Sequence, residues 1–236
     1  MSNVHKQVQP RHGRWHWTLT ILVYLTLPGV THTCPAPPPG QPLIEVRTSL
    51  GTMIIALYDQ TPLHRDNFLR RVRSGACDSL LFHRVVPGFT IEGGLSTSFT
   101  TPHGQAVPTP EDSIGIDPEF RPGLIHKHGA IGALPATVPG RSHTEGFYIV
   151  LGTRYGPHEL ARFLERRAEH DPAAGYTKAE EEAYATVGGL PHLDGAYTVF
   201  GEVVSGTEVL DALAAVACNE WDRPLSDVRM FMRELK

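Results

Sequence analysis

The sequence predicts a mainly β protein, in which about eight short strands close into an antiparallel barrel capped by two principal helices. Three observations predict this class. The apolar segments are short and separated by turn residues, only two principal helical patterns accompany them, and strands and helices do not alternate as in a parallel sheet. With 236 residues, 41% of them hydrophobic and 19% charged, the chain suits one globular domain with appendages.

The first elements of this domain are two strands and a helix. Residues 43–47 and 53–58 read as strands, and they are joined by a turn in which Gly51 can take a positive φ. A helix follows, with Thr61 expected at its N-cap and a proline in its first turn. Gly75 is expected to end this helix.

The most informative stretch is residues 82–94, which read FHRVVPGFTIEGG and predict a strand, a Pro-Gly turn and a second strand. Arg84 stands there among the apolar residues Phe82, Val86 and Phe89. Because a guanidinium is always charged, a sheet retains one in such surroundings only where something pairs it. Arg84 is therefore either a structural ion-pair partner or a hydrogen-bond donor that points into a ligand pocket.

The remaining elements of the barrel are shorter. Residues 95–122 are rich in Pro, Thr, Ser and Gly and predict a long surface loop. Residues 207–217 predict the second principal helix, with Val209, Leu210 and Leu213 on its apolar face. Further strands are expected at residues 129–134, 147–151, 197–204 and 228–232.

Residues 156–189 predict an inserted helical hairpin. Leu160 and Phe163 provide apolar positions in its first helix, and Thr177 with Glu180 forms a capping box at the start of the second. The charge-rich faces of both helices are typical of solvated surfaces. Two roles stay open: the hairpin either shields one edge of the barrel or offers a docking site to a partner.

The N-terminal residues are typical of an export signal. Lys6, Arg11 and Arg14 precede an apolar run over residues 15–30, which is too short for a comfortable membrane span. This pattern favours a signal peptide at residues 1–33 over a permanent anchor. The expected location is the periplasm or, with a lipid anchor, the membrane surface.

Cys34 follows the apolar run and begins a proline-rich tether, residues 34–42. Bacterial lipoproteins resemble this arrangement, in which an acylated cysteine and a stiff linker hold a domain off the membrane. Residues 30–33 are a poor lipobox, so lipidation at Cys34 and plain secretion both stay open. The folded domain is expected at residues 43–236.

Four blocks in order resemble the cyclophilins. Besides residues 82–94, they are residues 46–53 (VRTSLGTM), residues 146–150 (GFYIV), and residues 193–195 with 199–206 (LDG and VFGEVVSG). The resemblance covers about residues 43 to 236. It implies a barrel with a helix over each mouth, and peptidyl-prolyl cis-trans isomerase activity on proline-containing polypeptides. Together with the export pattern, this makes folding envelope proteins the expected substrates.

Rotation about an X-Pro bond is slow because the amide resists twisting. An enzyme accelerates it without a nucleophile, metal or cofactor, by gripping the proline ring and aiming a donor at the prolyl nitrogen of the twisted state. The resemblance implies that Arg84 is this donor. The pocket positions that it implies are Phe89, Thr90, Glu92, Tyr148, His192, Leu193 and Tyr197.

The chain departs from the common family pattern at several of these positions. Glu92 and Gly146 stand where glutamines are usual, Tyr148 replaces phenylalanine, and His192 and Tyr197 replace tryptophan and histidine. The Pro-Gly turn places Glu92 roughly opposite Arg84, where a carboxylate could grip the guanidinium in a bidentate pair and neutralise the donor. The alternative function is therefore a weakly active or inactive module that binds proline-containing segments or a partner protein.

Other functional classes are disfavoured. The net charge of −4 argues against a nucleic-acid partner, and we expect a monomer. His126 and His128 could form half of a metal site, but no HExxH or CxxC motif accompanies them, so neither metal nor cofactor is expected. Cys77 and Cys218 either form a disulfide after export or stay as buried thiols.

Overall fold

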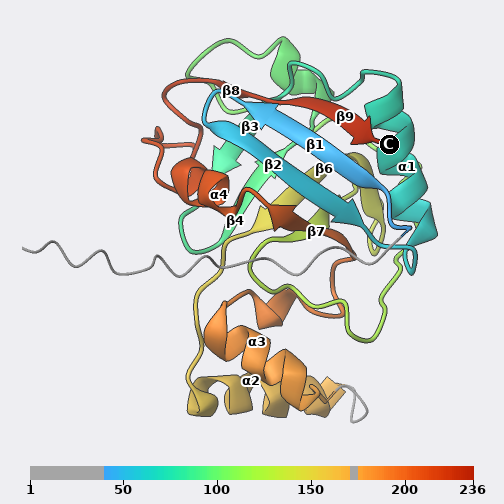
Figure 1. Cartoon of the computed structure of the whole chain (residues 1–236), viewed down its shortest axis with the longest axis vertical. Helices are drawn as coiled ribbons and strands as arrows, with labels where there is room; N and C mark the ends of the chain where they lie inside the picture. The colour runs from blue at the N-terminus through green and yellow to red at the C-terminus, as the bar shows by residue number, and fades with distance from the viewer. Residues whose placement is uncertain (1–39, 171–174) are drawn as a thin grey trace, which may run out of the picture. The chain divides into compact units, whose positions relative to one another are not determined.

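The computed structural model describes residues 40–170 and 175–236. The predicted signal peptide (residues 1–33), the lipidation candidate Cys34 and most of the tether (residues 34–42) lie outside the described residues. The described part contains nine strands and four α-helices (Figure 1).

The nine strands form one antiparallel sheet that nearly closes into a barrel. Its order is β8-β3-β4-β6-β5-β7-β2-β1-β9, and every neighbouring pair is antiparallel. The strands are β1 Leu43–Thr48, β2 Gly51–Leu57, β3 Leu81–Val85, β4 Thr90–Gly93, β5 Ala130–Pro135, β6 Ser142–Val150, β7 Val199–Ser205, β8 Val228–Arg229 and β9 Phe231–Leu235. The predicted antiparallel barrel is confirmed.

The last segment of the chain brings the two edges of the sheet together. β8 pairs with β3 and β9 pairs with β1, and only Met230 separates the two. The Met230 N–H donates to the carbonyl of Leu80 (2.9 Å), and its carbonyl accepts from Ser79 N–H (2.8 Å). The strand predicted at residues 228–232 is thus divided in two, which gives nine strands instead of about eight.

Alternation of side chains along the strands builds the core. Ile44, Val46, Met53 and Ile55 are fully buried inside the barrel, and they stand at every second position of β1 and β2. Gly51 begins β2 at φ 140°, and a Cβ there would lie 2.7 Å from a methyl carbon of Val209. The turn therefore needs glycine both for its backbone and for the close approach of a helix.

The two principal helices are confirmed. Helix α1 (Pro62–Arg73) buries Phe68, Leu69 and Val72, and helix α4 (Thr207–Ala214) buries Val209, Leu210 and Leu213. These faces join the main apolar cluster of the barrel. In Figure 1 the two helices lie at opposite sides of the barrel.

The cap of α1 differs from the prediction. Thr61 occupies the N-cap position, but its side chain accepts no capping hydrogen bond. The buried Glu119 carboxylate takes this role instead, because Leu63 N–H (3.2 Å) and His64 N–H (3.0 Å) both donate to it. A carboxylate from the long loop thus satisfies N–H groups at the positive end of the helix.

The predicted surface loop at residues 95–122 is anchored at several points. It begins with a short 3₁₀ helix, η1 (Ser96–Phe99), and Ile116 later forms a β-bridge with Ser142. That bridge lies where β6 begins, five residues before the strand start that the sequence predicts.

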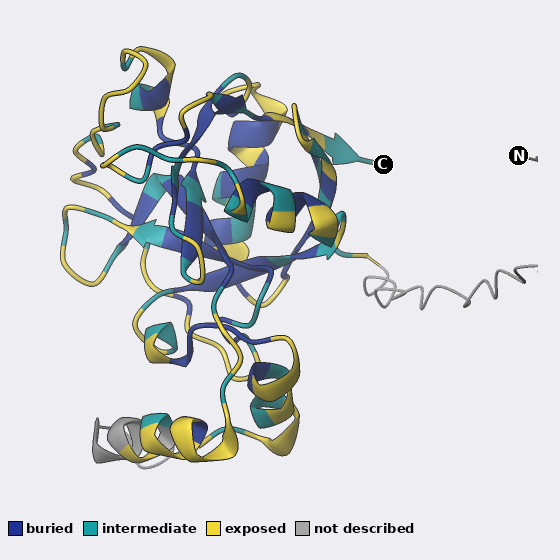
Figure 2. Ribbon diagram, turned by 90° about the vertical axis from the view of Figure 1, so that its left-hand side faces the viewer, coloured by how far each residue is buried: buried dark blue, intermediate teal, exposed yellow. Residues whose placement is uncertain are grey.

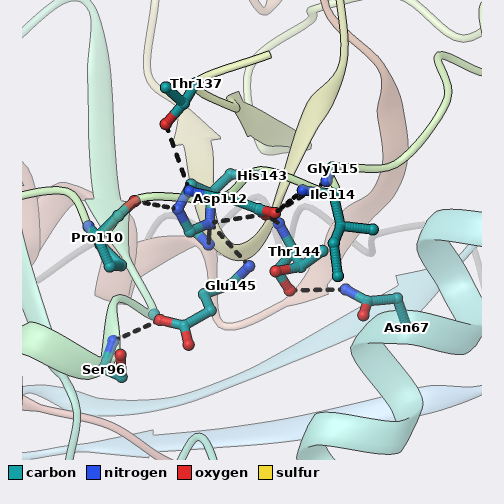
Figure 3. A network of polar contacts seen from close by, with 12 residues as sticks. Asn67, Ser96, Pro110, Asp112, Ile114, Gly115, Thr137, His143, Thr144 and Glu145 are labelled. Atoms are coloured by element: carbon teal, nitrogen blue, oxygen red, sulfur yellow. Dashed lines mark hydrogen bonds and ion pairs between the residues drawn. The ribbon is translucent and has the colours of Figure 1, made fainter.

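Asp112 is the centre of this anchorage (Figure 3). Its carboxylate accepts hydrogen bonds from the backbone N–H groups of Ile114 (3.1 Å), Gly115 (2.8 Å) and Thr144 (2.6 Å). Burial by itself raises the pKa of this carboxyl, but these hydrogen bonds outweigh burial and lower the pKa to about 2. The charged form of Asp112 therefore holds the loop on β6.

Two helices connect β6 to β7: α2 (Pro157–His170) and α3 (Lys178–Thr186). The predicted capping box is confirmed, with Thr177 N–H donating to Glu180 (2.6 Å) and Glu180 N–H to the Thr177 hydroxyl (3.3 Å). The outward faces of α3 and of residues 157–163 in α2 are exposed (Figure 2). Leu160 and Tyr184 pack with Ile125 in a cluster separate from the barrel core.

None of the helices among the described residues has the length and apolar character that a membrane span requires. Cys77 and Cys218 do not form the disulfide that the sequence left open; both thiols are free, and Cys77 is buried.

Candidate functional site

A pocket of about 130 Å³ opens where β4, β5 and β6 adjoin. Its lining comprises Phe89, Thr90, Glu92, Leu134, Pro135, Tyr148, Leu193 and Tyr197. Six of these eight are residues that the sequence assigns to a proline pocket. The pairing of strands explains how they meet, since Glu92 and Gly132 both stand opposite Tyr148 in the sheet.

Aromatic rings form the walls of this pocket. The rings of Phe89 and His192 stack with centroids 6.1 Å apart and an interplanar angle of 10°. Tyr148 and Tyr197 meet edge to face at 6.5 Å. His192 thus contacts the wall residue Phe89, although it is itself exposed and not part of the lining.

Leu134 and Pro135, at the end of β5, are lining residues that the sequence reasoning missed. Their presence is linked to Gly146, where the family usually has glutamine. A Cβ at Gly146 would lie 2.6 Å from Cδ1 of Leu134 and 3.0 Å from Cδ2 of Leu95. Apolar side chains therefore occupy the space that a longer side chain at residue 146 would need.

Arg84 is connected to the pocket by its hydrogen bond to Glu92. The two residues are cross-strand partners in β3 and β4, as the turn predicted, and Arg84 Nη1 donates to Glu92 Oε1 at 2.6 Å. The other arm of the guanidinium, Nη2, donates to Asp222 Oδ2 at 3.1 Å. The expected bidentate pair with Glu92 is therefore not formed, because two carboxylates share the guanidinium.

Asp222 could not be identified from the sequence. It lies 138 residues from Arg84 in a loop between α4 and β8, with a positive φ of 58°. Its carbonyl accepts a hydrogen bond from Val85 N–H (2.8 Å), which fixes it beside β3. Burial tends to lower the pKa of Arg84, but Glu92 and Asp222 raise it above its ordinary value, so the guanidinium stays charged.

A buried hydrogen-bond network supports the opposite wall. The Tyr148 hydroxyl lies 2.8 Å from His126 Nε2, and His126 Nδ1 lies 2.6 Å from Asp194 Oδ1. The hydroxyls of Tyr176 and Tyr184 each donate to Asp194 Oδ2 at 2.5 Å. The pocket wall is thus linked to the segment that carries α3.

The charge states in this network follow from burial and hydrogen bonding. Burial raises the pKa of Tyr148 well above its ordinary value, so its hydroxyl stays protonated. Burial also tends to raise the pKa of Asp194, but hydrogen bonds from His126, Tyr176 and Tyr184 outweigh it and lower that pKa. Asp194 is therefore a buried carboxylate held by several donors.

The two histidines that the sequence singled out are engaged within the protein. His126 and His128 precede β5, and the His126 ring is bound by Asp194 and Tyr148. His128 Nδ1 lies 2.7 Å from the carbonyl oxygen of Leu151. Over residues 40–170 and 175–236, no group of three or more His, Cys, Asp or Glu side chains is arranged to hold a metal ion.

Comparison with known sequences identifies relatives of this chain. The model of the family "Cyclophilin type peptidyl-prolyl cis-trans isomerase/CLD" matches residues 43–234. A Streptococcus pyogenes protein named as a bifunctional phosphatase/peptidyl-prolyl cis-trans isomerase is 32% identical over 192 residues; the match covers 79% of this chain but only 37% of that protein. A Staphylococcus aureus protein named as a peptidyl-prolyl cis-trans isomerase is 26% identical, over 80% of this chain and 89% of its own length.

Solved structures share the fold. A cyclophilin-type isomerase of Cryptosporidium parvum superimposes with a TM-score of 0.58 at 20% identity, over 83% of this chain and 98% of its own. The same protein solved in the presence of the dipeptide Ala-Pro gives a TM-score of 0.56 at 21% identity, over 80% and 96% of the two chains. With the family match over residues 43–234, these findings show that the chain belongs to the cyclophilin-type peptidyl-prolyl cis-trans isomerases.

Proposed function

We propose that this chain accelerates rotation about X-Pro bonds, with the proline ring held between the aromatic walls and Arg84 as the donor to the prolyl nitrogen. The observation that carries this function is the hydrogen bond between Arg84 and Glu92. Glu92 lines the apolar pocket together with Phe89 and Tyr148. The Ala-Pro dipeptide used with the Cryptosporidium relative supports a proline-containing ligand.

Such a site works without covalent chemistry. As the amide twists, its resonance is lost and the prolyl nitrogen becomes a hydrogen-bond acceptor, so a donor that favours the twisted state lowers the barrier. The walls restrain the ring, and the charged guanidinium of Arg84 supplies the donor. Two of the five N–H donors of Arg84 are bound to Glu92 (2.6 Å) and Asp222 (3.1 Å), so these carboxylates restrain the guanidinium and compete with the substrate for its charge.

The binding of Arg84 by two carboxylates favours a second candidate function. With both arms of the guanidinium bound to carboxylates, the chain would hold proline-containing segments and turn them over slowly or not at all. Each 1.4 kcal/mol withheld from the transition state lowers the rate about tenfold. The two functions differ in turnover and not in binding, so one assay separates them.

The test is Arg84→Ala in the full chain, with a protease-coupled proline-peptide assay. Turnover is expected to fall by about one to three decades, or roughly 1.4 to 4 kcal/mol of transition-state stabilisation, while peptide affinity changes much less. Arg47→Ala, which removes an exposed arginine of β1, is the matched control and should leave turnover unchanged. Unchanged turnover in Arg84→Ala would assign Arg84 a purely structural ion pair.

For location, we propose export, with envelope proteins as substrates, on the pattern of residues 1–33 and Cys34. The intact mass of the native protein should then show the loss of about 30 residues. A diacylglyceryl adduct on Cys34 would distinguish a lipoprotein from a secreted protein. Recovery of the full-length chain from the membrane fraction would contradict both versions.

A further inference from the structure

A second and larger cavity, of about 710 Å³, adjoins the proline pocket. One side is formed by residues 119–127 and the other by residues 175–183, which include the start of α3. We call it the lateral groove. Tyr197 lines both cavities, and Leu124 lines the groove while packing in the apolar cluster of the pocket. The groove and the pocket are therefore neighbours that share the side chain of Tyr197.

The far wall of the lateral groove has a fixed position relative to the pocket. Tyr176, which lines the groove, donates its hydroxyl to Asp194, and the hydroxyl of Tyr184 donates to the same oxygen. Asp194 in turn holds His126, whose ring contacts the pocket residue Tyr148. Because buried hydrogen-bonded networks of this kind are rigid, a chain that enters the pocket meets the groove at a defined offset.

The groove carries charges of both signs, and its charged side chains are engaged within the protein, Glu180 by the N–H and hydroxyl of Thr177. Glu119 binds the ring of His64 (2.7 Å), Arg121 donates to the carbonyl of Gln60 (2.9 Å), and the Lys127 ammonium lies 2.6 Å from Glu202. What the groove offers a ligand is tyrosine rings, Leu124, small alanine side chains and the exposed ring of Phe120. Such a lining suits an uncharged polypeptide segment better than a phosphate or a nucleic acid.

The sizes of the two cavities indicate how they divide a substrate. The pocket, at about 130 Å³, is small beside the roughly 300–1,000 Å³ of most ligand sites, whereas the groove at 710 Å³ lies within that range. A proline ring fits the former, and several residues of extended chain fit the latter.

We propose that the lateral groove binds the residues that flank the proline on one side of an extended polypeptide substrate. The chain would then act on long, largely uncharged segments better than on short peptides. This inference rests on the proposed function, because the groove receives the flank only of a chain whose proline sits in the pocket.

The test compares two peptides with the same X-Pro centre, a tetrapeptide and a neutral peptide of about twelve residues. Ala179 is exposed and lines the groove at the start of α3, so Ala179→Trp fills the groove. Ala185 is exposed on the same helix but does not line the groove, so Ala185→Trp is the matched control. Phe120→Ala removes an exposed groove ring without adding bulk.

Ala179→Trp is expected to raise KM about tenfold for the long peptide, which corresponds to 1.4 kcal/mol, and to leave tetrapeptide turnover unchanged. Phe120→Ala should act in the same direction and more weakly, and Ala185→Trp should affect neither peptide. Equal effects on both peptides, or none on the long one, would overturn the groove proposal while leaving the proposed isomerase in place.

A different result addresses the proposed function itself. If the wild-type chain does not turn over even the tetrapeptide, the isomerase reading fails. The groove is then tested by fluorescence anisotropy of the same long peptide, labelled at one end, against the same variants. Binding that is no tighter for the long peptide than for the tetrapeptide, or that Ala179→Trp does not weaken, overturns the groove proposal in that case too.

Discussion

Two regions of this protein hold carboxylates in different ways: the ion pairs of Arg84 beside the proline pocket, and the buried interior. Glu92, which lines the pocket, and Asp222, in the loop beside β3, both bind the partly exposed guanidinium of Arg84, and we call this group of three the mouth. Asp194 lies in the interior, where a histidine ring, tyrosine hydroxyls and a backbone N–H surround it. Asp112, under the long loop, is likewise held by backbone N–H groups.

The two regions differ in how readily water can replace a lost hydrogen-bond partner. At the mouth, Arg84 and Asp222 are 38% and 46% exposed, so water competes for their ion pair and the pair contributes little to stability. In the interior, the side chains of Asp194 and Asp112 are almost fully buried, so a donor that loses either carboxylate is satisfied by water less readily. The carboxylates at the mouth thus control the availability of Arg84, whereas Asp194 and Asp112 hold the pocket wall and the long loop in place.

The largest effect is expected for Asp194→Asn, compared with Asp222→Asn. The first change weakens the hydrogen bonds to His126, Tyr176 and Tyr184 and should lower the free energy of unfolding by about 3 kcal/mol. The second, at a carboxylate that is 46% exposed, should cost less than about 1 kcal/mol. Asparagine also tolerates the positive φ of residue 222. Urea unfolding measures the free energy of unfolding of both variants. Equal losses would show that the interior and mouth carboxylates do not differ in their contribution to stability.

A second effect concerns pH and the interior carboxylate Asp112. Its pKa is about 2 in the folded protein, below its ordinary value, so its charged form stabilises the fold. This contribution, about 2 to 3 kcal/mol, is fully present above the unfolded-state pKa and is lost as the pH falls through the folded pKa. The difference in unfolding free energy between wild type and Asp112→Asn should therefore shrink as the pH falls from about 5 to below 2. A difference that stays constant over that range would show that ionisation of Asp112 is not the cause.

The next prediction tests the mouth directly. Glu92→Gln keeps the shape of the side chain and an acceptor oxygen but removes the charge, so it should release Arg84 toward the substrate. We expect kcat/KM to rise by about tenfold, which corresponds to 1.4 kcal/mol. Stability should fall slightly, because one charge is left beside an apolar wall. Lower activity in this variant would show instead that Glu92 orients Arg84 productively.

The smallest effect is expected for turnover in Asp222→Asn. Its bond to Arg84 is longer than that of Glu92, 3.1 Å against 2.6 Å, and Asp222 is more exposed. Releasing this arm should raise kcat/KM by about twofold, and added salt should reduce the difference from wild type because exposed pairs are screened. A gain as large as that of Glu92→Gln would show that Asp222, and not Glu92, restrains the donor.

The sequence by itself determined the features that depend on neighbours along the chain. The Pro-Gly turn set the register that places Glu92 opposite Arg84, the spacing of Thr177 and Glu180 gave the capping box, and alternation gave the buried face of β1. Turn geometry, helical spacing and strand period act over a few residues, so they can be read directly from the sequence.

Only the tertiary structure decided the contacts between distant segments. Asp222 binds Arg84 across 138 residues of chain, and Glu119 caps α1 across 56. The lateral groove exists because residues 119–127 face the start of α3. No local pattern encodes such contacts, because an exposed-looking Asp or Glu in a loop gains its partner only when the barrel brings that loop beside a strand or a helix end.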